Sequence, residues 1–292
     1  MARTRQKALS HGRPRITKPK EYMSSQQSRT IIRTHHRLHK EHAAAIRKGD
    51  SKLAESITRA IENNGGIEVY QAASKQGQSK DRGGDSSKVL IDWLRNSRVF
   101  QSDGVHKDDG ERREVTTIRC LEVGALSIQN EISKYPNRIA MTRIDLNSQG
   151  PGIEKQDFMQ RPLPSTRTEC FDLISLSLVL NYVPEAPQRG EMLKRITKFL
   201  RRQDALKNTD TAVFPALFLV LPLPCVENSR YLDDALLQNI MMNLGFTLTQ
   251  QKKTPKLCYY LFHFNGNATK TKTGKRKVRD GPAMNNFCIV VD

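Results

Sequence analysis

Two residues with the spacing of a nucleoside-binding site lie at the ends of successive apolar runs. Gly124 lies at the end of TIRCLEVGA, and Asp145 lies at the end of RIAMTRIDL, 21 positions later. A glycine after the first strand lets a ligand approach the backbone, and an acid about 20 residues further on accepts hydrogen bonds from ribose hydroxyls. Gly124 alone fits equally well a buried strand-to-helix turn that binds no ligand, but the pair predicts a cofactor that contains a nucleoside.

The residues around this pair narrow the type of cofactor. Dinucleotide sites seat a pyrophosphate on a glycine-rich helix start, whereas alanine and leucine follow Gly124. S-adenosylmethionine has no phosphate. Glu122 is a candidate for contact with its methionine part, although the same carboxylate equally fits a structural network. In KQDFM, Asp157 is a candidate for the adenine amino group, and Phe158 or Met159 for packing on the ring. An ordinary loop with one buried aromatic is the alternative for that segment.

Apolar runs alternate with amphipathic stretches after residue 116, which predicts a doubly wound parallel sheet. Strands are expected at 117–125, 138–146, 171–180 and 216–224, and helices at 126–135, 187–201 and 231–245. The last two strands are expected within 246–265 and 287–291, with no helix between them, so one is antiparallel. This order resembles the class I S-adenosylmethionine-dependent methyltransferase fold, an α/β, Rossmann-like, mostly parallel seven-stranded sheet with an antiparallel edge strand.

The segment LNYVPEAP carries the side chains best suited to a substrate base. It follows the expected fourth strand, and ligands of open α/β sheets bind at the carboxyl ends of the strands. Asn181 is suited to hydrogen-bond an adenine edge, and Tyr182 to stack on a flipped adenine. A helix cap and a core aromatic are the structural alternative for these two residues. The two prolines are not adjacent, so the segment departs from the [DN]PP[YFW] tetrad of exocyclic-amine methyltransferases and is compatible with methylation of ring N1.

The chain is expected to have three parts. Residues 1–20 form a disordered basic arm, 21–115 a small basic helical N-terminal region with a linker, and 116–292 the S-adenosylmethionine-binding methyltransferase domain. Helices in the N-terminal region are expected at 21–48, 49–66 and 86–97. The second has Asp50 or Ser51 as its cap and ends at the glycine pair 65–66.

The net charge of +18 is concentrated in two segments. Residues 1–40 carry 11 Lys and Arg against one acid, residues 251–280 carry nine against one, and the rest balances at 28 of each sign. Such patches suit a polyanion, because each Lys or Arg that meets a phosphate releases a counterion. A nuclear-import signal or a solubilising tail is the alternative. The basic loop NATKTKTGKRKVRDGP is expected to join the last two strands beside the active site and to hold RNA phosphates.

Metal, disulfide and membrane sites are not predicted. Four histidines crowd the first helix without an acid or a cysteine arranged around them, so RNA backbone contact is favoured over a metal; they are His35, His36, His39 and His42. The five cysteines form no CxxC or zinc pattern, which favours buried thiols in a reducing compartment. No apolar run approaches the roughly 18 residues of a transmembrane helix, and the N-terminus lacks the apolar stretch of a secretory signal.

Four longer segments carry a family resemblance. They are NNGGIEVYQAASKQGQS (63–79), CLEVGALS (120–127), RIDLNSQGPGIEKQDFMQRPLP (143–164) and FDLISLSLVLNYVPEAPQRGEML (171–193). Over roughly residues 60–290 the chain resembles the fungal large-subunit (25S) ribosomal RNA adenine-N1 methyltransferases, whose metazoan relatives act as S-adenosylmethionine sensors. The resemblance implies that Gly124 and Asp145 contact S-adenosylmethionine. It also implies a nuclear, nucleolar enzyme that methylates N1 of an adenine in large-subunit rRNA, free or in a preribosome.

Other functions remain compatible with the same residues. A sensor would bind S-adenosylmethionine and act through a protein partner without catalysis, although it has no evident need of two basic segments. A ribosome-assembly factor with a degenerate cofactor fold would bind rRNA without using Asp145. Methylation of a protein or a small molecule fits the charge distribution less well.

Overall fold

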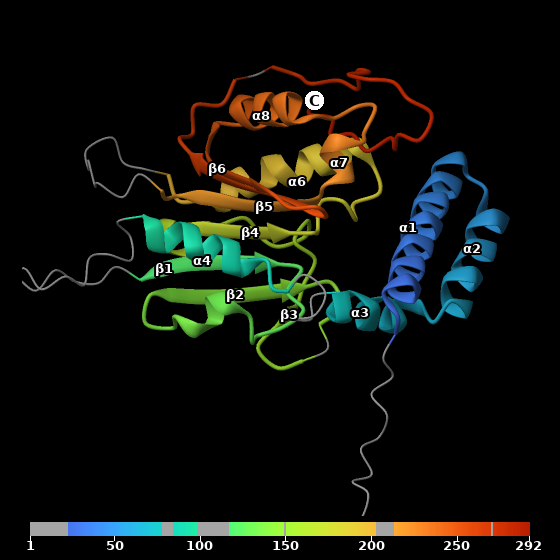
Figure 1. The fold of residues 1–292 in the computed structure, drawn as a ribbon, viewed down its shortest axis with the longest axis horizontal. Helices are drawn as coiled ribbons and strands as arrows, with labels where there is room; N and C mark the ends of the chain where they lie inside the picture. The colour runs from blue at the N-terminus through green and yellow to red at the C-terminus, as the bar shows by residue number, and fades with distance from the viewer. Residues whose placement is uncertain (1–22, 78–83, 98–116, 149, 203–212, 270) are drawn as a thin grey trace, which may run out of the picture.

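The computed structural model describes residues 23–77, 84–97, 117–148, 150–202, 213–269 and 271–292 (Figure 1). The predicted basic arm at 1–20 and nearly all of the predicted linker lie outside these residues. The described residues form a helical unit that lies beside the carboxyl ends of the strands of a sheet (Figure 1). The helical unit consists of α1 (Ser25–Lys48), α2 (Ser51–Asn63) and α3 (Gly66–Gly77).

The sheet has seven strands in the order β3-β2-β1-β4-β5-β7-β6. They are β1 (Ile118–Val123), β2 (Ile139–Asp145), β3 (Glu154–Lys155), β4 (Leu173–Ser177), β5 (Ala216–Pro222), β6 (Phe246–Lys253) and β7 (Leu257–Phe264). Neighbouring strands are parallel except at β7, which runs antiparallel to both β5 and β6. This is the predicted class I methyltransferase sheet, with the antiparallel strand one position in from the edge.

Helices cover both faces of the sheet. They are α4 (Ser87–Asn96), α6 (Ala186–Phe199), α7 (Pro224–Glu227) and α8 (Asp234–Asn243), with the 3-10 turns η2 (Glu131–Lys134) and η3 (Arg167–Glu169). Successive residues of a strand point to opposite faces. In β5, Leu217 and Leu219 pack in the cluster that contains α6 and α8, whereas Phe218 and Val220 pack in the cluster that contains α4. Burial on both faces explains why this strand reads as one uninterrupted apolar run.

The helical unit has a small core of its own. Leu38 and Ala45 of α1 pack against Ala54 and Ile57 of α2. The predicted second helix is confirmed, because the side chain of Asp50 accepts a hydrogen bond from the backbone of residue 53 at 3.0 Å and caps α2. The helix α3 was not predicted, since the glycine pair at 65–66 indicated only an end. In the structure these glycines turn the chain, and α3 begins within the pair.

The prediction of a helix at 126–135 is wrong. Only the four-residue turn η2 forms there, and the polar side chains before it bond locally instead of leaving the backbone free for a helix. The hydroxyl of Ser127 accepts from the backbone of Gln129 at 3.0 Å. The start of η2 is held by the first residue of α4, since the backbone N–H of Ile132 donates to the hydroxyl of Ser87 at 3.1 Å. The N-terminal helix α4 therefore packs where the expected helix would have covered the sheet.

The expected placement of the final strand at 287–291 is also wrong. The two closing strands, β6 and β7, both lie within 246–264 as a hairpin. Thr254 closes its turn, because the backbone N–H of Thr254 donates to the carbonyl of Leu257 at 2.8 Å and its hydroxyl accepts from the N–H of Leu257 at 3.0 Å. Residues 287–291 are apolar because they are buried against the core that contains α6, and not because they extend the sheet.

Gly190 shows how closely this C-terminal segment packs on α6. A methyl group at Gly190 would overlap the backbone carbonyl oxygen of Val290, and backbone atoms give way less readily than side-chain ends. We expect Gly190→Ala to destabilise the protein by roughly 1–3 kcal/mol or more, the usual cost of overpacking. Urea unfolding measures the loss. Gly274→Ala is the matched control, because nothing lies within 4 Å of an added methyl group there; equal midpoints for the two variants would contradict the prediction.

The basic segment at 267–282 does not join the last two strands. It follows β7, and the last residues of β7 pair with the first residues of β5 and β6. The segment therefore begins at the amino ends of the parallel strands, on the side of the sheet opposite the cavity. It then returns, because Arg279 donates to the carbonyl oxygen of Glu227 at 2.6 Å on α7, directly after β5. The turn at the carboxyl edge is instead the β6–β7 turn, which contains Lys256.

The cysteines form no disulfide in the described structure. All five cysteines are free, and Cys120, Cys258 and Cys288 are buried. Burial raises the pKa of Cys225 to about 12 and that of Cys258 to about 11, so both are thiols at neutral pH, in line with the prediction of buried thiols. No helix among the described residues has the length and apolar character needed to cross a membrane.

Candidate functional site

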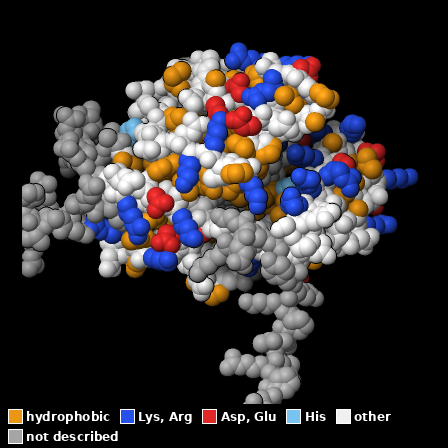
Figure 2. All heavy atoms as spheres, viewed as in Figure 1, with side chains coloured by type: hydrophobic (Ala, Val, Ile, Leu, Met, Phe, Trp, Pro, Cys, Tyr) orange, Lys and Arg blue, Asp and Glu red, His pale blue; other side chains and the backbone are white. Residues whose placement is uncertain are grey.

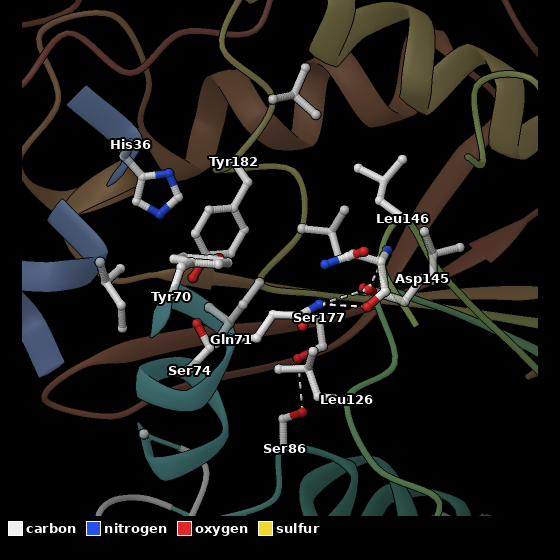
Figure 3. Close-up of a pocket in the computed structure, with 18 of the residues that line it drawn as sticks. His36, Tyr70, Gln71, Ser74, Ser86, Leu126, Asp145, Leu146, Ser177 and Tyr182 are labelled. Atoms are coloured by element: carbon white, nitrogen blue, oxygen red, sulfur yellow. Dashed lines mark hydrogen bonds between the residues drawn. The ribbon is translucent and has the colours of Figure 1, made fainter. Parts of the chain in front are cut away.

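A cavity of about 890 Å³ lies between the carboxyl ends of the central strands and the helical unit. Its walls come from the ends of β1, β2 and β4, from α1 and α3, and from the β6–β7 turn. Figure 3 shows side chains from α1 and α3 facing those that follow β2 and β4. This is the position at which open α/β sheets bind ligands. Of the seven predicted site residues, five line it: Gly124, Asp145, Asp157, Phe158 and Tyr182.

Gly124 forms a turn that only glycine accommodates well. Its φ is +76°, in the left-handed region, and a methyl group there would overlap Cγ2 of Val179. The backbone N–H of Gly124 donates to the carbonyl of Ile144 at 2.8 Å, which ties the ends of β1 and β2 together. The predicted close backbone approach is therefore present, with Val179 as the neighbour that a side chain would meet.

Asp145 is half-buried at the end of β2. Its Oδ1 accepts from the backbone N–H of Asn147 at 2.8 Å and from Nε2 of Gln71 at 3.3 Å. Burial raises the pKa of the Asp145 carboxyl, and the Asn147 hydrogen bond and the charge of Lys75 oppose that rise. Its Oδ2 carries no hydrogen bond within the described part of the chain, which leaves one oxygen for a donor in the cavity.

Asp157 and Phe158 lie on the loop after β3. Oδ1 of Asp157 accepts from the backbone N–H of Met159 at 2.8 Å and fixes that loop. Phe158 is 3% exposed and packs against Phe199 of α6, with ring centroids 5.2 Å apart. The structure thus gives the loop a structural role while also placing both residues in the cavity wall. Their contact with a cofactor stays a prediction.

Glu122 does not line the cavity. Its carboxylate accepts from Nδ2 of Asn130 at 2.9 Å and forms an ion pair with Arg143 at 3.4 Å. Burial is the largest influence on this carboxyl and raises its pKa to about 6, against the opposing effect of both partners. Of the two interpretations that the sequence left open for Glu122, this placement favours the structural network.

The neighbours Asn181 and Tyr182 have different surroundings. The ring of Tyr182 lines the cavity and stacks on His36 of α1, with centroids 4.1 Å apart and planes at 27°. It also meets Tyr70 of α3 edge-on at 5.7 Å. Asn181 is not among the lining residues, and its Oδ1 is buried without a hydrogen-bond partner in the described structure. The geometry therefore brings Tyr182, but not Asn181, to the cavity.

The helical unit contributes a wall that the sequence did not predict. Its three rings, His35, His36 and Tyr70, pack with Tyr182 of the sheet domain, and we call these four residues the aromatic wall. His35 stacks on Tyr70 with centroids 4.3 Å apart and planes at 14°. The segment at 63–79 supported the family resemblance, but without α3 there was no reason to place Tyr70 opposite the glycine turn. The sequence identified the four histidines of the first helix, but only the packing of α1 on α3 shows which of them face the cavity.

The histidines of the aromatic wall are uncharged at neutral pH. Burial lowers the pKa of His35 to about 4 and that of His36 to about 3, with neighbouring positive groups adding to the effect. An uncharged imidazole is a poor phosphate ligand, so these two positions do not fit the predicted RNA backbone contact. No group of three or more metal-ligating side chains is found among the described residues.

The low pKa of His36 makes stability depend on pH. Unfolded histidine binds a proton near pH 6.5, whereas folded His36, facing Tyr182 and near His35, His39 and Lys40, binds one only near pH 3. The unfolded state therefore binds more protons below pH 6.5, and stability falls as pH falls. We expect His36→Phe, which keeps the ring, to flatten the slope between pH 6 and 4 by at most about 1.4 kcal/mol per pH unit. Urea unfolding across this range measures both slopes, and identical slopes would refute the prediction.

Two curated proteins and one solved structure illustrate what this chain is similar to. The chain is 40% identical over 237 residues to the Saccharomyces cerevisiae 25S rRNA (adenine(2142)-N(1))-methyltransferase, covering 80% of this chain but only 63% of that protein. It is 36% identical over 262 residues to the Schizosaccharomyces pombe 25S rRNA adenine-N(1) methyltransferase, covering 89% of each. Among solved structures, the 16S rRNA methylase RmtB superposes with a TM-score of 0.41 at 14% identity, covering 84% of this chain and all of that one.

The family model described as 25S rRNA (adenine(2142)-N(1))-methyltransferase, Bmt2, matches residues 55–289. The match begins in α2 and ends in the C-terminal segment packed on α6, so it includes α3 and the whole sheet. It therefore includes every predicted site residue and most of the cavity wall. The chain belongs to the Bmt2 family of 25S rRNA adenine-N1 methyltransferases.

Proposed function

We propose that this protein transfers a methyl group from S-adenosylmethionine to N1 of an adenine in large-subunit rRNA. The observation that carries the proposal is the cavity at the carboxyl ends of β1 and β2. It contains Gly124 in a left-handed conformation and Asp145, whose Oδ2 makes no hydrogen bond in the described structure. Membership of the Bmt2 family supplies the substrate class.

The cavity fits S-adenosylmethionine in volume and in chemistry. Its 890 Å³ falls within the roughly 300–1,000 Å³ of small-molecule sites. Oδ2 of Asp145 is suited to a ribose hydroxyl, and Asp157 and Phe158 are suited to the adenine. When bound, the cofactor supplies an electrophilic methyl group on a positively charged sulfur. His35 and His36 are uncharged at neutral pH, so they add no positive charge that would oppose a cationic ligand.

The substrate base requires positioning more than proton transfer. Adenine N1 has an in-plane lone pair at neutral pH, so a general base is not needed, and the chain contributes alignment and exclusion of water. N1 lies on the Watson–Crick edge, so a paired adenine must be flipped out before it reacts. Tyr182, at the cavity end of the segment after β4, is our candidate for stacking on that base. Asn181 would need to turn toward the cavity to contact it.

Basic side chains lie on both units near the cavity. Figure 2 shows Lys and Arg side chains on the helical unit and on the sheet domain where the two meet, and Lys256 of the β6–β7 turn lines the cavity itself. Phosphate contacts from such groups make RNA affinity fall steeply with salt. The same proposal places the protein in the nucleus and nucleolus and gives it rRNA or a preribosome as its partner.

A methylation assay tests the proposal directly. The protein is incubated with S-adenosylmethionine labelled in its methyl group and with unmodified large-subunit rRNA, and N1-methyladenosine is mapped in the product and in rRNA from cells with and without the gene. The expected result is labelled rRNA with one modified adenine that is absent in the deletion strain. Tight cofactor binding without transfer to either naked rRNA or preribosomes would instead support an S-adenosylmethionine sensor.

A further inference from the structure

Gln71 connects the helical unit to the predicted ribose-binding acid. It lies on α3 and is 4% exposed. Its Nε2 donates to Oδ1 of Asp145 at 3.3 Å and to the carbonyl oxygen of Asn147 at 2.8 Å. Figure 3 shows the Gln71 side chain extending from α3 toward Asp145. These two acceptors fix which end of the amide faces β2, because the reverse orientation would place Oε1 against two other oxygens.

The other end of this amide is unpaired. Oε1 of Gln71 is buried and has no hydrogen-bond partner in the described structure, although the side chain lines the cavity. A buried acceptor without a donor is costly and uncommon in native proteins. The orphaned oxygen therefore indicates a ligand that brings a donor into the cavity next to Asp145.

The hydrogen bonds already made by Asp145 show why a second acceptor is needed. Its Oδ1 accepts from Gln71 and from Asn147, which leaves Oδ2 for a ligand. A ribose presents two neighbouring hydroxyl donors. One carboxylate oxygen suits one of them, and Oε1 of Gln71 is an unpaired buried acceptor in the described structure that lines the same cavity and belongs to an amide already bonded to Asp145.

We infer that Oε1 of Gln71 and Oδ2 of Asp145 each accept a hydrogen bond from one hydroxyl of the cofactor ribose. The inference rests on the proposed function for the identity of the ligand. It makes α3 part of the cofactor site, so the helical unit and the sheet bind the ribose together. Gln71 is then a binding residue for the cofactor supplied by a segment that lies outside the sheet domain.

Isothermal titration with S-adenosylhomocysteine tests this inference without catalysis. We expect Gln71→Ala to weaken binding roughly 3- to 10-fold, the loss typical of one neutral hydrogen bond. Gln76→Ala is the matched control, because Gln76 lies on the same helix and also has a buried, unpaired Oε1 but is not among the cavity-lining residues. Its affinity should stay within about 2-fold of the wild-type protein.

Analogues that lack one ribose hydroxyl make the test independent of how the variant folds. We expect the 2′-deoxy and the 3′-deoxy forms of S-adenosylhomocysteine each to bind the wild-type protein more weakly than S-adenosylhomocysteine does. The analogue that lacks the hydroxyl bound by Gln71 should have the same affinity for Gln71→Ala as for the wild-type protein. Unchanged or tighter binding to Gln71→Ala would mean that Gln71 only caps Asp145, which overturns the inference and leaves the proposed function intact. If the wild-type protein did not bind S-adenosylhomocysteine at all, the proposed function would fail together with it.

Discussion

Asp145→Ala is expected to weaken binding of S-adenosylhomocysteine by roughly 100-fold or more and to abolish detectable methyl transfer at moderate cofactor concentrations. Hydrogen bonds to a charged group contribute about 1.5–3 kcal/mol each, and this carboxylate also holds the amide of Gln71 in place. The loss of the Asn147 hydrogen bond would loosen the loop after β2 in the same variant. Titration calorimetry and a labelled-methyl assay measure the two effects.

A neighbouring acid provides the control for Asp145→Ala. Glu154 lies on β3, which pairs with the end of β2, but it is exposed and is not among the residues that line the cavity. Glu154→Ala removes the same formal charge from the same edge of the sheet, so it should bind the cofactor within about 2-fold of wild type. Equal losses in the two variants would point to a general charge effect and contradict a specific role for Asp145.

Gly124→Ala is expected to lower the free energy of unfolding by roughly 2–5 kcal/mol and to disrupt the cavity. The left-handed backbone costs a residue with a side chain about 1–2 kcal/mol, and overlap with Val179 adds about 1–3 kcal/mol of overpacking. The variant should also bind the cofactor poorly, because Val179 lines the cavity and must move. Urea unfolding and titration with S-adenosylhomocysteine measure the two losses.

Two further variants separate the causes of that loss. Gly49 has a similar φ of +71° with nothing within 4 Å of an added methyl group, so Gly49→Ala reports the backbone cost alone. Adding Val179→Ala to Gly124→Ala removes the overlap, and a double-mutant cycle isolates that term. If Gly49→Ala and Gly124→Ala were equally destabilising, the overlap with Val179 would be of no consequence.

The features predictable from the sequence are those that depend on burial of whole elements. β4 and β5 are buried on both faces and read as continuous apolar runs, and α6 presents a regular apolar stripe that is buried in the structure. Gly124 and Asp145 were predictable because they lie at the ends of two adjacent parallel strands. The length of the connection between these strands sets the number of residues that separate the glycine from the acid. The strand order then follows from the class I fold without further information.

The features that the sequence did not predict depend on which distant segment occupies a surface. The stretch at 126–135 has helical periodicity, but α4 already covers that face of the sheet. Residues 287–291 have strand-like composition, but they are buried against α6 instead of pairing in the sheet. Gln71 gave no signal at all, because α3 itself was not predicted and one glutamine is unremarkable until the fold brings it to Asp145.

The walls of the cavity come from segments far apart in the polypeptide, from Ile32 on α1 to Tyr259 on β7. During translation, the helical unit leaves the ribosome first and the β6–β7 hairpin leaves among the last elements. A nascent chain that stops before residue 259 therefore lacks one wall, however well its earlier segments have folded. Acquisition of a complete pocket is thus a late event in biosynthesis, which precedes only the C-terminal segment that packs on α6.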